Sequence, residues 1–216
     1  EANKLIGLSY KEGAKFSDAI HFLTLAEMNA STNEQIFNSK IEIIKINILR
    51  RTTNRALSLL DDLRKDERFK EKSNEINYWT GWTYIFADDW EKASQVFAVI
   101  DSTLFLKTFC DSVKHDFYNV TLAKALSLVP GLGQFYTGEY VSGFISFGWN
   151  VLWGYLTINA ISEDRVFDGF IIGTLLWYRF YSGNLQNAEK FARQKNLEKT
   201  NAALHYLKNY YNGNKP

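Results

Sequence analysis

The first half of the chain repeats itself every 37 residues, and this period constrains the fold more than any other feature. Three alanines carry the period, and each is followed by apolar residues four and seven positions later. The three sets are Ala19, Leu23 and Ala26; Ala56, Leu60 and Leu63; and Ala93, Phe97 and Ile100. Positions i, i+4 and i+7 share one face of an α-helix. The pattern therefore predicts three equivalent helices, each with a small residue where a neighbouring helix approaches.

A matching helix precedes two of these three. Gly7 and Tyr10 stand before Ala19 at the same spacing as Gly81 and Tyr84 before Ala93, whereas the middle copy has Ile44 and Asn47 there. This spacing resembles the tetratricopeptide repeat (TPR), a helix-turn-helix unit of 34 residues, over about residues 2–101. The resemblance implies a concave surface that binds a peptide or a protein partner. The alternative is a packing scaffold, because the matching positions are core positions.

The predicted fold class is all-α. Turn and cap residues place six helices near 2–12, 16–29, 33–50, 53–66, 72–87 and 89–101, with a capping helix at 103–118. The predicted domains are a TPR-like array of three units at 1–102, a capping or linker helix at 103–120, an apolar helical hairpin at 121–184, and a C-terminal amphipathic helix and tail at 185–216.

Three tryptophans in the last repeat, Trp79, Trp82 and Trp90, are candidate partner-binding residues. Large amphipathic side chains contribute much of the binding energy at protein interfaces. The alternative is that these indoles belong to the repeat core, which we expect for two of the three.

The second half contains two apolar stretches. Residues 141–161 are 21 residues without a charge. At ~1.5 Å per residue a helix of this length extends about 31 Å, enough to cross a hydrocarbon core. A polar turn at 162–165 leads to a second stretch at 166–181, interrupted by Asp168 and Arg179. Two interpretations stay open: a membrane-embedded hairpin, and two helices buried in a soluble core or against a partner.

Small and polar residues within this region predict close packing. The glycines at 138, 143, 148, 154, 169, 173 and 183 permit close helix contact. Gln134, Asn150, Asn159 and Asn184 lie in apolar surroundings, and an unpaired buried amide is costly. We therefore expect these four side chains to pair across the hairpin.

A short motif opens the apolar region and another closes it. The first is Pro130-Gly131-x-Gly133-Gln134-x-Tyr136-x-Gly138-x4-Gly143, and the second is Gly183-Asn184-x3-Ala188-x7-Asn196. Together they resemble a hydrophobic module of uncharacterised bacterial envelope proteins, over about residues 121–196. The resemblance implies a location and an architecture, with Asn150 counted among the module's polar positions, and it implies no reaction.

Several function classes are disfavoured. The formal net charge is +1, so a global electrostatic hold on nucleic acid is not expected. Cys110 is the only cysteine, the three histidines lack ligand spacing, and no nucleotide-binding or hydrolase motif occurs. A Cys110–His115 nucleophile pair is conceivable, but a core cysteine beside a surface histidine is the expected arrangement. We therefore expect no enzyme activity, no cofactor and no metal.

These features predict a non-enzymatic interaction scaffold of the bacterial cell envelope, with repeats that bind a partner protein and a hairpin that anchors or docks at a membrane. Basic flanks and an acidic turn favour cytoplasmic flanks by the positive-inside rule, whereas the resemblance to envelope proteins favours the periplasmic side, which is the side we predict. The chain starts at Glu1 and not at a methionine, so removal of a signal or lipid-anchor segment stays open. The alternatives are a soluble obligate subunit of a hetero-oligomer whose hairpin its partner buries, and a carrier of a hydrophobic ligand.

Overall fold

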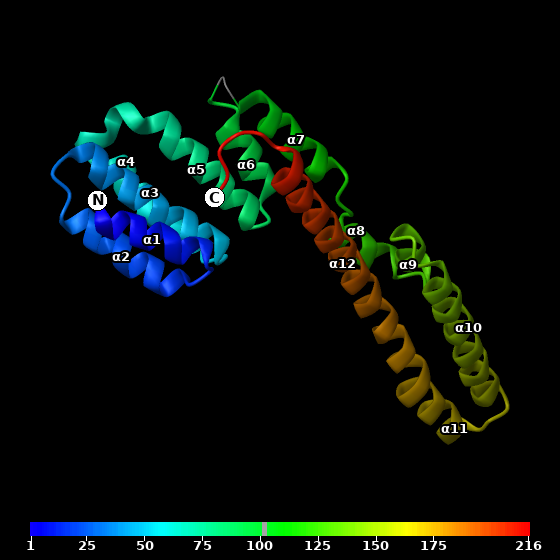
Figure 1. The fold of residues 1–216 in the computed structure, drawn as a ribbon. Coiled ribbons are helices and arrows are strands. Elements are labelled where there is room, and N and C mark those ends of the chain that lie inside the picture. Colours follow the sequence, from blue (N-terminus) through cyan, green and yellow to red (C-terminus); the bar gives the residue numbers. More distant parts are fainter. Residues whose placement is uncertain (101–102) are drawn as a thin grey trace. The chain divides into compact units, whose positions relative to one another are not determined.

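The computed structural model describes residues 1–100 and 103–216, and this part of the chain is all-α. Residue 101, the expected end of the sixth helix, and residue 102, the expected end of the repeat array, lie outside the described residues. The chain divides into two compact units (Figure 1). The first unit comprises Glu1–His115 and Tyr210–Pro216, and the second comprises Asp116–Asn209. The boundary at Asp116 lies inside the predicted linker helix.

The first five helices of the first unit follow the predicted bounds closely, and the next two are shorter than predicted. They are α1 (Ala2–Glu12), α2 (Phe16–Met28), α3 (Asn33–Leu49), α4 (Thr53–Lys65), α5 (Ser73–Phe86), α6 (Trp90–Phe97) and α7 (Leu104–His115). A short 3-10 helix that the sequence pattern does not predict, η1 (Glu67–Lys72), lies between α4 and α5. From α1 to α7, each of these α-helices packs against the next α-helix in the chain.

The turns of three successive helix pairs have one conformation. A non-glycine residue with positive φ stands in each turn: Ala14 at 55°, Arg51 at 55° and Asp88 at 60°. The next residue donates its backbone N–H to the carbonyl oxygen five positions earlier, in the pairs Lys15–Tyr10, Thr52–Asn47 and Asp89–Tyr84. These residues lie 37 apart, so the turns α1–α2, α3–α4 and α5–α6 recur at the period of the sequence pattern.

The repeated apolar positions form the core of the first unit. Ala19, Leu23, Ala56, Leu60, Ala93 and Phe97 are all buried. A Cβ added to Gly7 would lie 2.7 Å from Leu23 Cγ, and one added to Gly81 would lie 2.5 Å from Phe97 Cζ. The two glycines therefore make the same close helix contact in the first and third pairs, as their sequence positions predict.

An ion-pair cluster joins α1 to α3 in this unit. Glu42 accepts hydrogen bonds from Lys45 Nζ at 2.6 Å and from Lys11 Nζ at 3.0 Å. Burial alone would raise the pKa of Glu42, but the hydrogen bonds and charges of the two lysines hold it below its ordinary value. Glu42 is therefore charged at neutral pH and contributes to the α1–α3 contact.

The second unit contains the predicted apolar hairpin. Its helices are α8 (Val120–Leu126), α9 (Leu132–Tyr136), α10 (Tyr140–Ser162), α11 (Val166–Ile171), the π-helix η3 (Ile172–Trp177) and α12 (Tyr178–Tyr210). The helix α8 ends at Leu126, before Pro130, as expected, and Gly131, the N-cap of α9, has a φ of 91° that other residues rarely adopt. The helix α10 packs along α11 and η3.

The return helix is longer than the sequence predicts. Residues 166–210 form one uninterrupted helical run, so the expected boundary between a hairpin at 121–184 and a C-terminal helix at 185–216 falls inside α12. No proline interrupts this run, and the side chain of Asn184 forms its hydrogen bonds away from the helix backbone. The polar Gly183-Asn184 step therefore does not end the helix.

Candidate functional site

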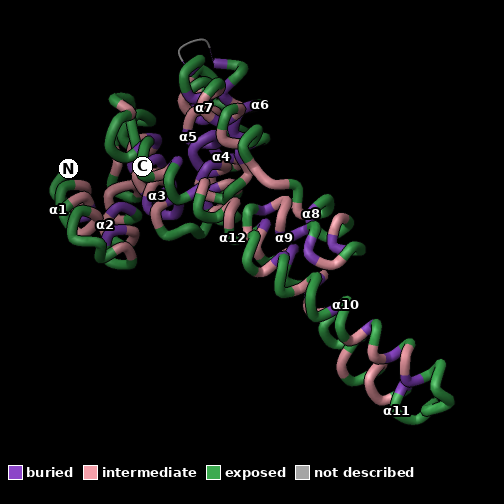
Figure 2. The backbone as a smooth tube through the Cα atoms, turned by 90° about the vertical axis from the view of Figure 1, so that its right-hand side faces the viewer, coloured by how far each residue is buried: buried purple, intermediate pink, exposed green. Residues whose placement is uncertain are grey.

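Large apolar side chains cover the outside of the hairpin. We call them the hairpin apolar surface, and Figure 2 shows the α10–α11 end mostly exposed or half-buried. Its exposed members are Tyr140, Val141, Phe144, Ile145, Phe147, Trp149, Val151, Leu152, Tyr155, Ile158, Ile161, Val166, Phe167, Phe170, Leu175, Trp177, Tyr178 and Phe180. Exposure reaches 75% at Val141 and 74% at Phe167. Large exposed apolar patches are typical of protein–protein or membrane interaction sites.

The inward face of α10 has the opposite composition. Its buried residues are Gly143, Asn150, Gly154, Thr157 and Ala160, which are small or polar. Successive residues of an α-helix are rotated by about 100° around its axis. In projection down the axis of α10, the exposed apolar side chains fill an arc of about 200°, with Phe147 at one edge and Trp149 at the other. A helix of a water-soluble protein buries its large apolar side chains and exposes polar ones. The helix α10 therefore has an inside-out distribution.

Close contacts in the hairpin are made by glycines, though not by all of those predicted. A Cβ would meet a neighbouring side chain within 4 Å at Gly143, Gly154, Gly169 and Gly173. At Gly133 it would collide with Ser127 and the backbone of Ala123. The expectation is wrong for Gly138, Gly148 and Gly183, where no heavy atom lies within 4 Å. Gly138 instead has a φ of 80° in the turn before α10.

The two predicted motifs meet at Asn184. Its Oδ1 accepts hydrogen bonds from Gly131 N at 3.0 Å, Gln134 Nε2 at 3.0 Å and Ser146 Oγ at 2.8 Å. Its Nδ2 donates to the carbonyl oxygen of Ser127 at 2.6 Å. Asn184 is 2% exposed, and Gln134 and Ser127 are fully buried. One side chain thus ties the α8–α9 turn and α10 to α12.

A second brace uses the remaining motif residues. Asn196 holds the backbone of Tyr118 from both sides, accepting from its N–H at 2.8 Å and donating to its carbonyl oxygen at 2.9 Å. Tyr136 Oη accepts from the Asn119 N–H at 3.0 Å, and its ring packs edge-on against that of Tyr118. The motif residues therefore fix the start of the second unit, which is a structural role.

Only part of the predicted amide pairing occurs. Gln134 and Asn184 pair, but Asn150 donates Nδ2 to the carbonyl oxygen four residues before it, and Asn159 binds the carboxylate four residues after it. Across the described residues, Asn150 Oδ1 has no hydrogen-bond partner although the residue is 5% exposed. The prediction of cross-hairpin pairing is wrong for Asn150 and Asn159, because each side chain finds a partner on its own helix.

The three candidate tryptophans are core residues. Trp79, Trp82 and Trp90 are each 2% exposed, so the core position expected for two of the three holds for all of them. Each lies on the inward face of α5 or α6, where the repeat pattern already places apolar residues. The burial of the third tryptophan was not evident from its position at the first residue of a helix.

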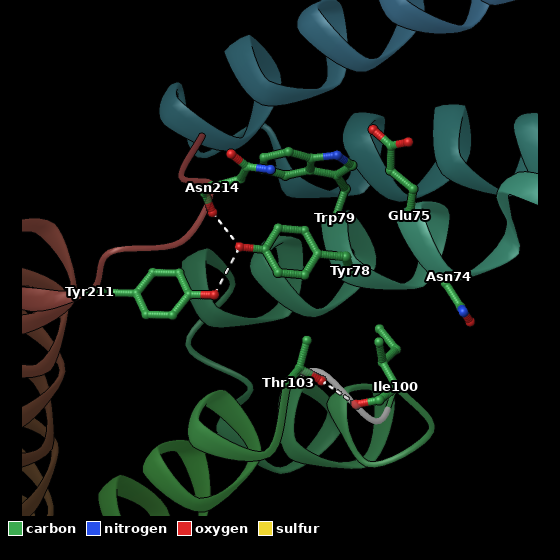
Figure 3. Close-up of a pocket in the computed structure, with 8 residues that line it drawn as sticks. All are labelled: Asn74, Glu75, Tyr78, Trp79, Ile100, Thr103, Tyr211 and Asn214. Carbon is green, nitrogen blue, oxygen red and sulfur yellow. Dashed lines mark hydrogen bonds between the residues drawn. The ribbon is translucent and has the colours of Figure 1, made fainter.

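A cavity of about 330 Å³ lies beside Trp79 in the first unit (Figure 3). Its lining is Asn74, Glu75, Tyr78, Trp79, Ile100, Thr103, Tyr211 and Asn214. Tyr78 Oη lies 3.2 Å from Tyr211 Oη and donates to the Asn214 carbonyl oxygen. Burial, followed by the hydrogen bond with Tyr211, raises the pKa of Tyr78 well above its ordinary range, so its hydroxyl remains protonated. Sequence reasoning missed this site because the tail that lines it is polar and lies far away in the sequence.

Metal-binding groups are not assembled in the described part of the chain, and its cysteine is buried. No group of three histidine, cysteine or acidic side chains there could hold a metal ion. Cys110 is buried, as expected, and burial raises the pKa of its thiol to about 12, with a smaller contribution from the charge of Asp111. The thiol is therefore not a ready nucleophile.

Neither the comparisons with known proteins nor a search of the described residues for membrane-spanning helices gave a match. No protein-family model, curated protein or solved structure matches this chain. Within residues 1–100 and 103–216, no helix combines the length and the apolarity that spanning a membrane requires.

Proposed function

We propose that the protein is a non-enzymatic interaction scaffold of the bacterial cell envelope, whose hairpin apolar surface docks into a membrane. The inside-out distribution of α10 is the observation that carries this proposal. Small and polar residues on the helix-packing face, with large apolar residues outside, are the arrangement of helices whose surroundings are lipid. Docking requires contact with the interfacial and hydrocarbon region, which a hairpin makes without crossing the bilayer.

Lipid is the occupant that best fits the shape of the surface. A partner helix or sheet covers one side of a helix, whereas about 200° of α10 exposes apolar side chains. The charged side chains Glu163, Asp164 and Arg165 gather at the hairpin tip, where they can remain in water. Tyr140, Trp149 and Tyr155 add amphipathic rings, which favour the headgroup level of a bilayer.

The first unit is proposed to be a TPR-like array that binds a protein partner, held on the periplasmic side of the membrane. Its three turns with a common conformation at 37-residue spacing support the repeat assignment. The cavity beside Tyr78 and Trp79 supports a binding role, because it combines aromatic walls with convergent polar groups.

Vesicle flotation tests the membrane proposal. Purified full-length protein is mixed with phospholipid vesicles, and the fraction that floats is measured for the wild type and for the triple variant Phe144→Ser, Tyr155→Ser, Phe167→Ser. These side chains are 68%, 64% and 74% exposed, so their removal costs few contacts within the hairpin beyond the ring contact of Phe144 with Phe135 at 5.0 Å. Transfer of one large apolar side chain contributes about 1.5–3 kcal/mol, so the variant should partition at least about a thousandfold more weakly.

The matched control is the triple variant Leu5→Ser, Met28→Ser, Leu104→Ser, which removes comparably exposed side chains from the first unit. It should float like the wild type. Equal flotation of the wild type and the hairpin variant would contradict the proposal. Failure of the wild type to float, with aggregation that a co-purifying protein relieves, would favour the soluble obligate subunit.

A further inference from the structure

A second cavity lies within the second unit, between α10 and α12. Its volume is about 350 Å³. Polar groups line it from both helices: Ser142, Ser146 and Asn150 from α10, and Arg179, Asn184 and Asn187 from α12. The rings of Trp149 and Phe180 also line it and stack with centroids 5.6 Å apart. A cavity with aromatic walls and several polar groups therefore opens within the hairpin apolar surface.

Two groups in this cavity lack partners. Asn150 Oδ1 is the buried acceptor without a hydrogen bond described above. Among the described residues, Arg179 forms no ion pair, although it is the only charged side chain that lines the cavity. A buried amide oxygen without a donor is costly, and a guanidinium on an apolar surface is poorly solvated once that surface is covered. Both groups would be satisfied by one ligand that has complementary chemistry.

The lining specifies that chemistry. A guanidinium has five donors in a planar fork and binds phosphate oxygens in pairs. Ser142 and the Asn187 amide add further donors, whereas Asn150 Oδ1 needs a donor from the ligand. None of the described residues in the lining is a carboxylate, so a hydroxyl suits the site better than an ammonium group, which Arg179 would repel.

We propose that this cavity binds the headgroup of an anionic, hydroxyl-bearing phospholipid, with its phosphate on Arg179 and its hydroxyl on Asn150. The acyl chains would lie along the hairpin apolar surface beside Trp149 and Phe180. This assignment rests on the proposed docking of the hairpin in a membrane, and it adds a preferred lipid class.

The test compares binding of the full-length protein to vesicles of phosphatidylcholine alone and to vesicles that also contain phosphatidylglycerol. The wild type should prefer the latter. Arg179→Gln should reduce this preference at least about tenfold, because a charge-assisted bidentate contact is lost, while binding to phosphatidylcholine alone changes little. Asn150→Leu should also weaken the preference, because the acceptor for the headgroup hydroxyl is removed.

The control is Arg193→Gln, which removes the same charge from an exposed position of α12, where Arg193 pairs with Glu189 at 2.9 Å. General attraction to an anionic surface is worth about fivefold per basic residue, so this control should lose no more than that. Equal losses in the two arginine variants would overturn the headgroup site and leave only nonspecific attraction. If soluble glycerol phosphate bound the cavity as strongly as phosphatidylglycerol does, the assignment of the ligand as a lipid would be overturned.

Failure of this site is distinguishable from failure of membrane docking. If the wild type floats with both vesicle types to the same extent, docking stands and the headgroup site is refuted. If it floats with neither, docking fails. Titration with short-chain phosphatidylglycerol below its micelle concentration then tests the cavity directly, and wild-type affinity in Arg179→Gln would refute the site.

Discussion

Replacement of Asn184 by leucine should destabilise the second unit more than any other single exchange at a motif residue. The side chain is 2% exposed and satisfies the Gly131 N–H, the Gln134 amide, the Ser146 hydroxyl and the Ser127 carbonyl. Leucine has a similar size and a better helix propensity than asparagine, so the loss of stability measures the contribution of the hydrogen bonds. A buried polar group left unsatisfied costs about 1–3 kcal/mol, and relaxation recovers part of it. We expect a loss of about 3–5 kcal/mol.

Urea unfolding in a mild detergent, followed by circular dichroism, measures this loss. Gln186→Leu is the control, because Gln186 is exposed on the same helix and makes only a 3.4 Å contact with Ser182. It should change stability by less than about 0.5 kcal/mol. Gln134→Leu should cost less in the Asn184→Leu background than alone, because the two side chains share a bond. The proposed role of the network in stabilising this unit would be refuted if Asn184→Leu lowered the free energy of unfolding by less than about 1 kcal/mol. It would also be refuted if the effects of Asn184→Leu and Gln134→Leu were strictly additive.

Three further expectations concern the first unit and its contacts. Gly81→Ala should destabilise by about 1–3 kcal/mol through overpacking on Phe97, while Gly148→Ala, in open space, should stabilise by about 0.5–1 kcal/mol; thermal unfolding distinguishes the signs. Glu42→Gln should lower the stability of the protein by about 1 kcal/mol at neutral pH. The difference in stability between variant and wild type should shrink as pH falls through the lowered folded-state pKa of Glu42, because protonation removes the same charge from the wild type. Urea midpoints measured over a pH series check this. Cys110 should resist iodoacetamide at pH 8 until urea is added, and rapid native alkylation would show that the thiol is accessible.

The helices of the first unit follow from local chemistry and were predictable. Apolar period, turn residues and the absence of interior prolines fix where a helix starts and ends, and α1 to α5 match the expected bounds closely. The left-handed residues Ala14, Arg51 and Asp88 were not predicted, because only one of them, Asp88, is a residue type that favours this conformation. The same conformation also occurs at Asp164, with a φ of 58°, in the turn between α10 and α11, so this turn is not confined to the repeated positions.

The burial and the hydrogen-bond partners of individual side chains were harder to predict. Trp79, Trp82 and Trp90 have the composition of interface residues, but the neighbours that bury them come from other helices. Asn150 and Asn184 are both amides at apolar positions, yet only Asn184 lies opposite donors on the α8–α9 turn. Sequence spacing places residues on a helix face, whereas pairing depends on the rotation of the neighbouring helix.

The two units bury their large apolar side chains to different extents. In the first unit, burial of Leu23, Leu60 and Phe97 supplies the hydrophobic stabilisation that folding in water requires. In the hairpin, Phe144 and Phe167 remain exposed, so folding in water gains little from them. The hairpin must then depend on the Asn184 network and on whatever covers its surface. Amides of α10 should therefore exchange with solvent faster than those of α5 in detergent-free buffer and slow down on addition of vesicles, because lipid would supply the missing burial.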